Sequence, residues 1–304
     1  MTPPERGIAT LDNITAVGLF SDDVWDALRR GVLDTEGRPE IGSEGGERLV
    51  RGERSSPERP LRQVFHLADG THVQIDLSAE GAKQNHWRPD RDNGCCCRIE
   101  FNPNKADHAV LGLLAEMEVD HVTRADVALD YPGVSVGGLA AYLPYARSDT
   151  CRRGEGGETQ TIQIGKRASR RHLVVYDKLA ELGIAEPGRS LTRVESRHRF
   201  RPSEDPPLGS DMLDGLRVVN RSVPEGLSLS DRLRWSAAVN DPGLFADVRE
   251  HDKARIRALM ADRPALDPDP VGAYGEQRER LLDELGDVLA GRTFGLVAEV
   301  YRRG

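Results

Sequence analysis

A tyrosine and a lysine two residues apart give this chain its clearest chemical signal. Tyr176 and Lys178 end the segment His172–Lys178, which has the composition of a β-strand. Alternate side chains of a strand share one face, so the phenol and the ammonium are predicted to lie together. A phenolate can attack phosphorus when a base removes its proton or a nearby cation stabilises its charge. The pair therefore favours work on a phosphodiester, although a lone tyrosine in a strand is more often a core or edge residue.

Carboxylates are the second feature. Glu195 alternates with Arg193 and Arg197 in the predicted strand Leu191–Phe200. Asp126 and Asp130 share one face of the predicted strand His121–Tyr131, where four residues separate their Cα atoms by about 13 Å. Glu195 with either aspartate would form an oxygen-ligand site of the kind that suits Mg²⁺ or Mn²⁺. The alternative is that these acids are simply the solvated face of each strand.

Basic residues gather around the same segments. Residues 151–201 carry a local charge of +6, and the remainder carries −14, within a net charge of −8. Because phosphates respond to the local field, such a basic island suits contact with DNA over one limited surface. A solvated arginine-rich face explains the composition equally well. The candidate DNA-binding residues are Lys166, Arg167, Arg170, Arg171, Arg193 and Arg197.

Other chemistries find little support. The chain has neither a GxxxxGK[ST] phosphate loop nor a GxGxxG motif after a strand, and its eight histidines include no His-x-His pair. Its four cysteines lack CxxC spacing, which favours small buried thiols over a metal site. No apolar run is long enough to span a bilayer and no signal-peptide pattern begins the chain, so we expect a cytoplasmic protein without a membrane partner.

The elements that would position these residues form an α+β fold. We expect a central, mainly antiparallel sheet with flanking helices, followed by a C-terminal helical appendage. One domain would cover residues 1–201, with a flexible insertion at 35–60, and a helical region would cover 210–304. The predicted hairpin Leu61–Leu77 turns at Asp69-Gly70, a dipeptide that tolerates positive φ. The expected strands are completed by Cys95–Phe101 and Thr161–Ile164, and the expected helices are Ser21–Arg30, Lys105–Met117, Val136–Ala146, Ser230–Val239, Gly243–Met260 and Gly272–Leu289.

An ordered series of short motifs resembles a known family. The series is Arg-Ile-Glu-Phe-Asn-Pro-Asn-Lys at 98–105, Thr-Arg-Ala-Asp-Val-Ala-Leu-Asp at 123–130, Thr-Ile-Gln-Ile-Gly-Lys-Arg-Ala-Ser at 161–169, Val-Val-Tyr-Asp-Lys at 174–178 and Thr-Arg-Val-Glu at 192–195. It resembles the replication initiation factors of rolling-circle plasmids and filamentous phages, the Rep-trans family, whose relatives include conjugative relaxases. The resemblance covers roughly residues 95–201.

This resemblance implies a metal-dependent enzyme that nicks and transfers single-stranded DNA at an extruded origin hairpin. Tyr176 would match the attacking tyrosine, which forms a 5′-phosphotyrosine link and leaves a free 3′-OH. Asp126, Asp130 and Glu195 would match the acids that hold Mg²⁺ or Mn²⁺, and Lys178 and Arg193 would hold phosphate. The domain 1–201 would then be the nicking and strand-transfer domain.

Several alternatives stay open at this stage. A relaxase of a conjugative or integrative element needs the same nick, and neighbouring genes would separate it from a replication initiator. A non-catalytic DNA-binding regulator on the same scaffold would bind DNA without a covalent product. An unrelated sheet protein would leave Tyr176, Asp126 and Glu195 scattered. The helical C-terminal region would read duplex DNA, form a homodimer or recruit a host helicase.

Overall fold

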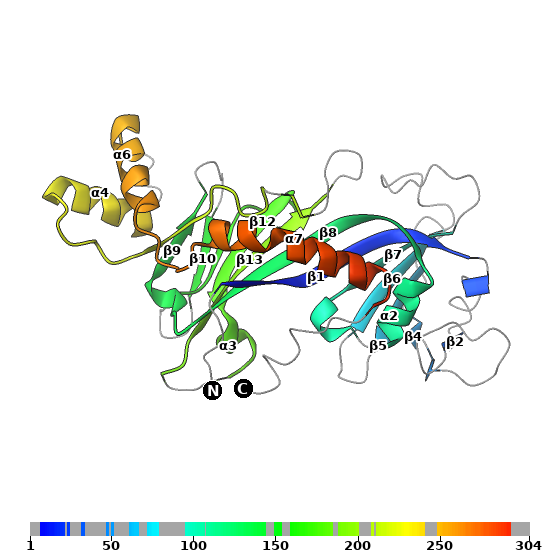
Figure 1. Ribbon diagram of the computed structural model, residues 1–304. Coiled ribbons are helices and arrows are strands. Elements are labelled where there is room, and N and C mark those ends of the chain that lie inside the picture. The colour runs from blue at the N-terminus through cyan, green and yellow to red at the C-terminus, as the bar shows by residue number, and fades with distance from the viewer. Residues whose placement is uncertain are drawn as a thin grey trace. The chain divides into compact units, whose positions relative to one another are not determined.

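The protein has an α+β fold in which antiparallel strands are accompanied by helices, and further helices follow toward the C-terminus (Figure 1). The predicted fold class is confirmed. The computed structural model describes residues 7–21, 23–24, 32–33, 47–48, 50–51, 61–66, 72–78, 95–106, 108–143, 149–153, 159–184, 188–200, 208–209, 211–240 and 248–292.

The chain divides into two compact units that do not follow chain order. The first comprises Met1–Ala9, Val127–His198 and Ser210–Arg278, and the second comprises Thr10–Asp126, Arg199–Gly209 and Glu279–Gly304. Strand β8 (Glu118–Pro132) and helix α7 (Pro270–Leu289) each contribute residues to both units. The predicted boundary after residue 201 falls on residues outside the described part and stays a prediction.

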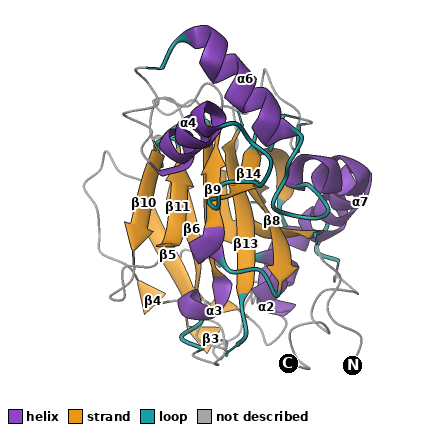
Figure 2. Ribbon diagram, turned by 90° about the vertical axis from the view of Figure 1, so that its left-hand side faces the viewer, coloured by secondary structure: helices purple, strands orange, loops and turns teal. Residues whose placement is uncertain are grey.

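The sheet of the first unit carries the Tyr176 segment. Strands β10 (Asp149–Arg153), β11 (Thr159–Ile164), β12 (Arg171–Asp177) and β13 (Leu191–Arg199) lie side by side in that order, followed by β8 (Figure 2). Every pair from β10 to β13 is antiparallel. The β-branched and aromatic residues of β12 suit this pleated environment.

Two residues, Gly165 and Ser169, hold the turn between β11 and β12 in place. Gly165 has a φ of +85°, and a Cβ at this position would lie 3.1 Å from the carbonyl oxygen of Arg171. The Ser169 hydroxyl donates to the backbone carbonyl of Arg171 at 2.7 Å. A residue without a Cβ is therefore suited to this tight turn. The basic segment 166–171 follows directly after this glycine.

Both faces of β12 and β13 are buried, but their chemistry differs. Leu173, Val175 and Val194 are wholly buried on one face, as an apolar core requires. On the other face the antiparallel register pairs Tyr176 with Arg193 and Val174 with Glu195. Directly opposed residues in an antiparallel pair point to the same side, so the register brings the two predicted strand faces together and places the tyrosine, the arginine and the glutamate on one polar face.

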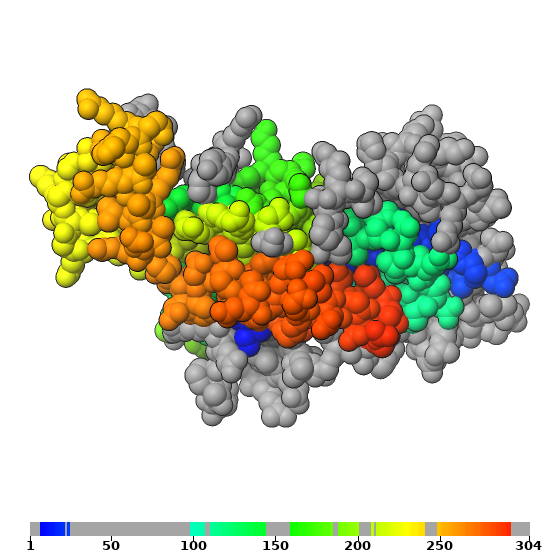
Figure 3. All heavy atoms as spheres, turned by 45° about the horizontal axis from the view of Figure 1, so that its top comes forward, coloured from blue at the N-terminus to red at the C-terminus, as the bar shows by residue number. Residues whose placement is uncertain are grey.

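A separate pair of helices belongs to the first unit. Helices α4 (Leu229–Asn240) and α6 (Glu250–Ala261) pack on each other around Trp235, Ile256 and Met260 (Figures 1 and 3). This small core includes Val219 of β14 (Arg217–Asn220), which pairs with β9 (Leu139–Tyr142). The predicted helix Ser230–Val239 is confirmed within one residue at each end.

The second unit contains the early strands. Its strand order is β8, β1 (Ile8–Phe20), β7 (Cys95–Phe101), β6 (His72–Ser78), β5 (Leu61–His66) and β4 (Val50–Arg51). The register His66↔His72 confirms the predicted hairpin, although its turn at residues 69–70 lies outside the described residues. The remaining elements are β2 (Val32–Leu33), β3 (Glu47–Arg48), the short η2 (Pro103–Lys105) and α2 (His108–Ala115).

Two helix predictions need correction. Val136–Ala146 was expected to be helical, but a single 3₁₀ turn, η3 (Val136–Gly138), is followed at once by β9. Gly137 and Gly138 disfavour a helix, and pairing of β9 with β14 satisfies the backbone instead. Helix α6 begins at Glu250 rather than at Gly243. Most of the predicted helix Ser21–Arg30, most of the insertion 35–60 and the chain after residue 292 lie outside the described residues.

Candidate active site

Tyr176 lies near the end of β12, opposite Thr161 on one side and Arg193 on the other. The residue is 7% exposed. Its two neighbours in register are polar or charged, unlike the apolar residues on the opposite face of the same strands. The phenol is therefore buried on the polar face and not in the apolar core.

Lys178 does not continue the strand, which corrects the predicted segment His172–Lys178. It is the first residue of the short helix α3 (Lys178–Glu181), and Asp177 is the N-cap residue. The Asp177 carboxylate accepts hydrogen bonds from the backbone N–H groups of Leu179 at 2.9 Å and Ala180 at 3.1 Å, which ends the strand by starting the helix. The Lys178 Nζ atom nevertheless lies 5.9 Å from the centroid of the Tyr176 ring. This distance is within the range of a cation–π contact.

Asp130 and Arg193 form a buried ion pair beside Tyr176. The Arg193 Nε and Nη2 atoms each donate to one Asp130 oxygen at 2.7 Å, and the two side chains are 5% and 13% exposed. Such a two-point contact is strong and fixes the plane of the guanidinium. The structure thus places one predicted phosphate-binding residue against one predicted metal ligand, next to the candidate nucleophile.

Glu195 is also paired with an arginine. Its Oε1 atom accepts a hydrogen bond from Arg197 Nε at 2.6 Å, and the Glu195 side chain is 3% exposed against 31% for Arg197. The arginine provides a counter-charge that a buried carboxylate needs. The predicted residues Tyr176, Arg193, Glu195 and Arg197 are therefore gathered on two adjacent strands, β12 and β13.

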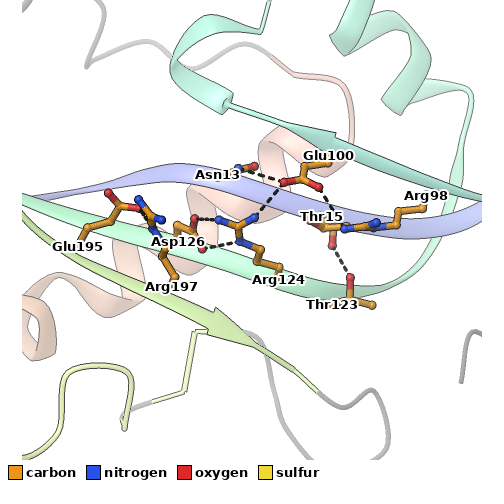
Figure 4. A network of polar contacts seen from close by, with 9 residues as sticks. All are labelled: Asn13, Thr15, Arg98, Glu100, Thr123, Arg124, Asp126, Glu195 and Arg197. Carbon is orange, nitrogen blue, oxygen red and sulfur yellow. Dashed lines mark hydrogen bonds and ion pairs between the residues drawn. The ribbon is translucent and has the colours of Figure 1, made fainter. Parts of the chain in front are cut away.

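Asp126 belongs to the second unit, where Arg124 connects it to Glu100 (Figure 4). The Arg124 guanidinium donates to Asp126 Oδ1 at 2.9 Å and to Glu100 Oε1 at 2.9 Å. Glu100 also accepts from Arg98 at 3.1 Å and from Asn13 at 3.4 Å. Asp126 is only 1% exposed, so its negative charge needs a counter-charge. The arginines that alternate with the acids in this network provide it.

Whether the protein can bind a divalent ion depends on these three acids. Carboxylate oxygens are the ligand type that Mg²⁺ and Mn²⁺ prefer. Asp126, Asp130 and Glu195 are each in contact with a guanidinium, with which an ion would compete. Within the described part of the chain, no group of three His, Cys, Asp or Glu side chains is assembled to hold a metal. Their role as metal ligands stays a prediction.

The basic turn before β12 separates into two pairs of residues. Arg171 Nη1 donates to the backbone oxygens of Asp211 at 2.6 Å and Asp214 at 2.9 Å, and Arg170 Nε donates to His198 Nε2 at 3.3 Å. Lys166 and Arg167 are exposed at the tip of the turn. Two of the four predicted DNA-binding side chains in this run are thus engaged within the protein.

In three other described tyrosines, burial disfavours the phenolate form. Burial raises the pKa of Tyr142 to about 12 and the pKa of Tyr274 to about 12. Burial, reinforced by nearby aspartates, raises the pKa of Tyr131 further, and its hydroxyl donates to the Pro268 carbonyl at 3.0 Å. Raising a phenol pKa disfavours the phenolate.

Two participants were not identified as site residues from sequence: Arg124, which holds Asp126, and Glu181, which forms an ion pair with Lys178. Arg124 stands two residues before Asp126, and Arg193 and Arg197 flank Glu195 at the same spacing. An arginine two positions from an acid was therefore a sequence signal that could have identified Arg124. Glu181 could have been predicted only if Asp177 had been recognised as the cap of a helix that contains both Lys178 and Glu181.

The comparisons with known proteins agree with the sequence motifs. A replication initiation protein from Staphylococcus aureus is 24% identical over 216 residues, which are 68% of this chain and 67% of that protein. A second one from the same organism is 23% identical over 219 residues, or 68% of this chain and 66% of that protein. No family model matches.

One solved structure is also similar in part. A rolling circle replication initiator protein from Geobacillus stearothermophilus aligns with a TM-score of 0.40 and 12% identity, over 84% of this chain and 97% of that one. The two replication initiation proteins from Staphylococcus aureus match the chain over about two thirds of its length and of theirs, which confirms the predicted resemblance. None of the described helices is long and apolar enough to cross a membrane.

Proposed function

We propose that this protein initiates rolling-circle replication by nicking one DNA strand, with Tyr176 as the nucleophile. The observation that carries the proposal is the grouping of Tyr176 with Lys178 and with the Asp130–Arg193 pair in the first unit. The similarity to replication initiation proteins supplies the biological setting.

The reaction is a transfer of the DNA phosphodiester to the tyrosine. The phenol oxygen forms a bond to phosphorus, and the bond from phosphorus to the 3′ oxygen breaks. The phenol proton reaches the leaving 3′ oxygen through solvent, so a 5′-phosphotyrosine and a free 3′-OH result. The reverse transfer to another 3′-OH joins the strand and restores the tyrosine.

The charged neighbours have separate roles in this proposal. Lys178 stabilises the negative charge that develops on the phenol and phosphate oxygens. Arg193 contacts the phosphate, and Asp130 holds the guanidinium in one orientation. A divalent Mg²⁺ or Mn²⁺ ion, for which Asp130 and Glu195 are the candidate ligands in this unit, would act as a Lewis acid on the phosphate.

The DNA partner in this proposal is a single strand at an extruded origin hairpin. Lys166 and Arg167 are exposed at the turn before β12 and provide phosphate contacts. A host helicase and a second copy of the chain remain candidate partners for the C-terminal helical region. The burial of Tyr176 specifically favours a second candidate function, a DNA-binding protein without nicking activity, because a nucleophile must be reached by its substrate.

A covalent-capture experiment separates the two functions. Labelled hairpin oligonucleotides tiled across the DNA that encodes the chain are incubated with protein and Mn²⁺, and with EDTA in a parallel series. We expect wild type to form an SDS-resistant adduct in Mn²⁺ only, and Tyr176→Phe to lose it by a factor of about 10³ or more. Tyr142→Phe is the matched control, because the buried Tyr142 hydroxyl has no hydrogen-bond partner among the described residues and its removal costs little.

Each result decides a part of the proposal. An adduct from Tyr176→Phe would place the nucleophile elsewhere. DNA binding without an adduct from wild type would favour the non-catalytic function. An adduct that persists in EDTA would remove the metal from the proposal while leaving the tyrosine in place.

A further inference from the structure

Helix α3, which follows Tyr176 directly, is a single turn fixed at both of its ends. At its start the Asp177 carboxylate accepts two backbone N–H groups. At its end Gly183, with a φ of +70°, donates to the Ala180 carbonyl at 3.1 Å, and Ile184 donates to the Leu179 carbonyl at 2.9 Å. These two bonds form a Schellman motif, which closes a helix when a glycine adopts the left-handed conformation. A helix this short has little stability by itself, so the caps determine its position.

Within this capped turn Lys178 and Glu181 form an ion pair. The Lys178 side chain is 14% exposed and lies over the Tyr176 ring, whereas the Glu181 side chain is 51% exposed. Lysine side chains ordinarily extend into water because they lose much rotamer freedom when held. Here the pair and the two caps keep the ammonium over the ring.

A contribution to stability does not explain this arrangement well. Ion pairs with a half-exposed partner contribute little to folding, because water screens them. An ion pair that adds little to stability can still select one rotamer of a side chain, and small displacements of a charged group are costly for catalysis. The position of Lys178, rather than the stability of α3, is therefore what Glu181 controls.

We infer that Glu181 is a positioning residue that holds the Lys178 ammonium over the ring of Tyr176. The inference rests on the proposed function only for its catalytic consequence, since the restraint on Lys178 is measurable without DNA. Glu181 itself contacts neither the phosphate nor the phenol in this assignment. It acts on the nucleophile only through Lys178.

The first test measures the restraint directly by lysine acetylation followed by mass spectrometry. Lys166, which is exposed, is the internal reference. In wild type, Lys178 should react several-fold more slowly than Lys166. In Glu181→Gln the acetylation rate of Lys178 should rise by about threefold or more, because the ammonium is released from the carboxylate, while the rate of Lys166 stays the same. An unchanged Lys178 rate would overturn the inference, whatever the outcome of the DNA assays.

The second test measures the catalytic consequence. The rate constant of adduct formation at saturating DNA should fall about fivefold to tenfold in Glu181→Gln, and DNA affinity should change little. In a Lys178→Met background the same substitution should have no further effect, because two residues that act through one contact are not additive. Glu181→Asp should recover part of the rate. If Glu181→Gln lowers the rate constant further in the Lys178→Met background, Glu181 does not act through Lys178, and the inference is overturned.

The chain offers a matched control in α6. Lys253 and Glu250 are also three residues apart on a helix, at 2.7 Å, with side chains that are 12% and 77% exposed. Glu250→Gln should accelerate the acetylation of Lys253 and leave adduct formation unchanged. If wild type forms no adduct, the proposed nicking function fails and the catalytic role of Glu181 with it, while the acetylation result still decides the restraint.

Discussion

The end of β12 and the helix pair α4–α6 contain similar ion pairs in different surroundings. Each has a lysine–glutamate pair at a spacing of three residues, Lys178–Glu181 and Lys253–Glu250. Each also has a buried aspartate with an arginine partner, Asp130 with Arg193 and Asp231 with Arg255. The β12 region alone adds a tyrosine beneath the lysine. Buried ion pairs therefore do not define a candidate site in this protein, and the neighbouring nucleophile does.

The arginine partners of Asp130 and Asp231 differ in their solvent exposure. The Arg193 side chain is 5% exposed, so water does little to solvate its charge and the Asp130 carboxylate is a buried counter-charge. The Arg255 side chain is 57% exposed and is solvated with or without Asp231. A buried ion pair needs both of its members, whereas an exposed arginine does not need its acid.

The largest effect on stability is expected from Asp130→Ala. The substitution removes the two hydrogen bonds and the counter-charge that Asp130 gives to the buried Arg193 guanidinium, which should cost about 3–5 kcal/mol of unfolding free energy. Urea denaturation measures it, and adduct formation should be lost as well. A loss below about 1 kcal/mol would show that Arg193 reaches water and would remove the contrast with the helix pair.

Asp231→Ala should have a smaller and purely structural effect. Asp231 accepts hydrogen bonds from Ser228 at 2.8 Å and Arg255 at 2.7 Å, and its backbone N–H donates to the Ser228 hydroxyl at 3.2 Å as in an N-terminal helix cap. Losing one side of this arrangement should cost about 1–2 kcal/mol. The rate of adduct formation per folded molecule should stay at the wild-type value. A reduced rate at equal folding would give the helix pair a part in catalysis.

The smallest effect is expected at the tip of the basic turn. Replacing Lys166 and Arg167 by alanine removes two exposed cations, so the slope of log affinity against log salt concentration should decrease by about 1.4 for a single strand. Fluorescence anisotropy with a labelled oligonucleotide over a salt series provides the measurement. Replacing Arg170 and Arg171, which contact His198 and backbone carbonyls, should change stability more than the salt slope. Equal slopes for both double variants would contradict the separation of the turn into two pairs.

The alternation of residue types predicted which side chains of the candidate site share a strand face. Tyr176, Arg193 and Glu195 were expected on strand faces that the register of β12 and β13 now places together. Alternation is a local property of the backbone, so it survives whatever the strand packs against. The same approach failed at Lys178, because a capping aspartate at position 177 competes with continuation of the strand and wins.

The sequence by itself determined the α+β class, the polar face that carries Tyr176, and the similarity to replication initiation proteins. The tertiary structure alone decided which arginine meets which acid. Asp130 and Arg193 are separated by 63 residues, and their contact depends on how distant strands come together. It also decided that Asp126 lies in the second unit, where it is paired with Arg124. Spacing along a strand sets the direction of a side chain, but only the assembled sheet supplies its partner, because pairing between strands is a long-range property of the fold.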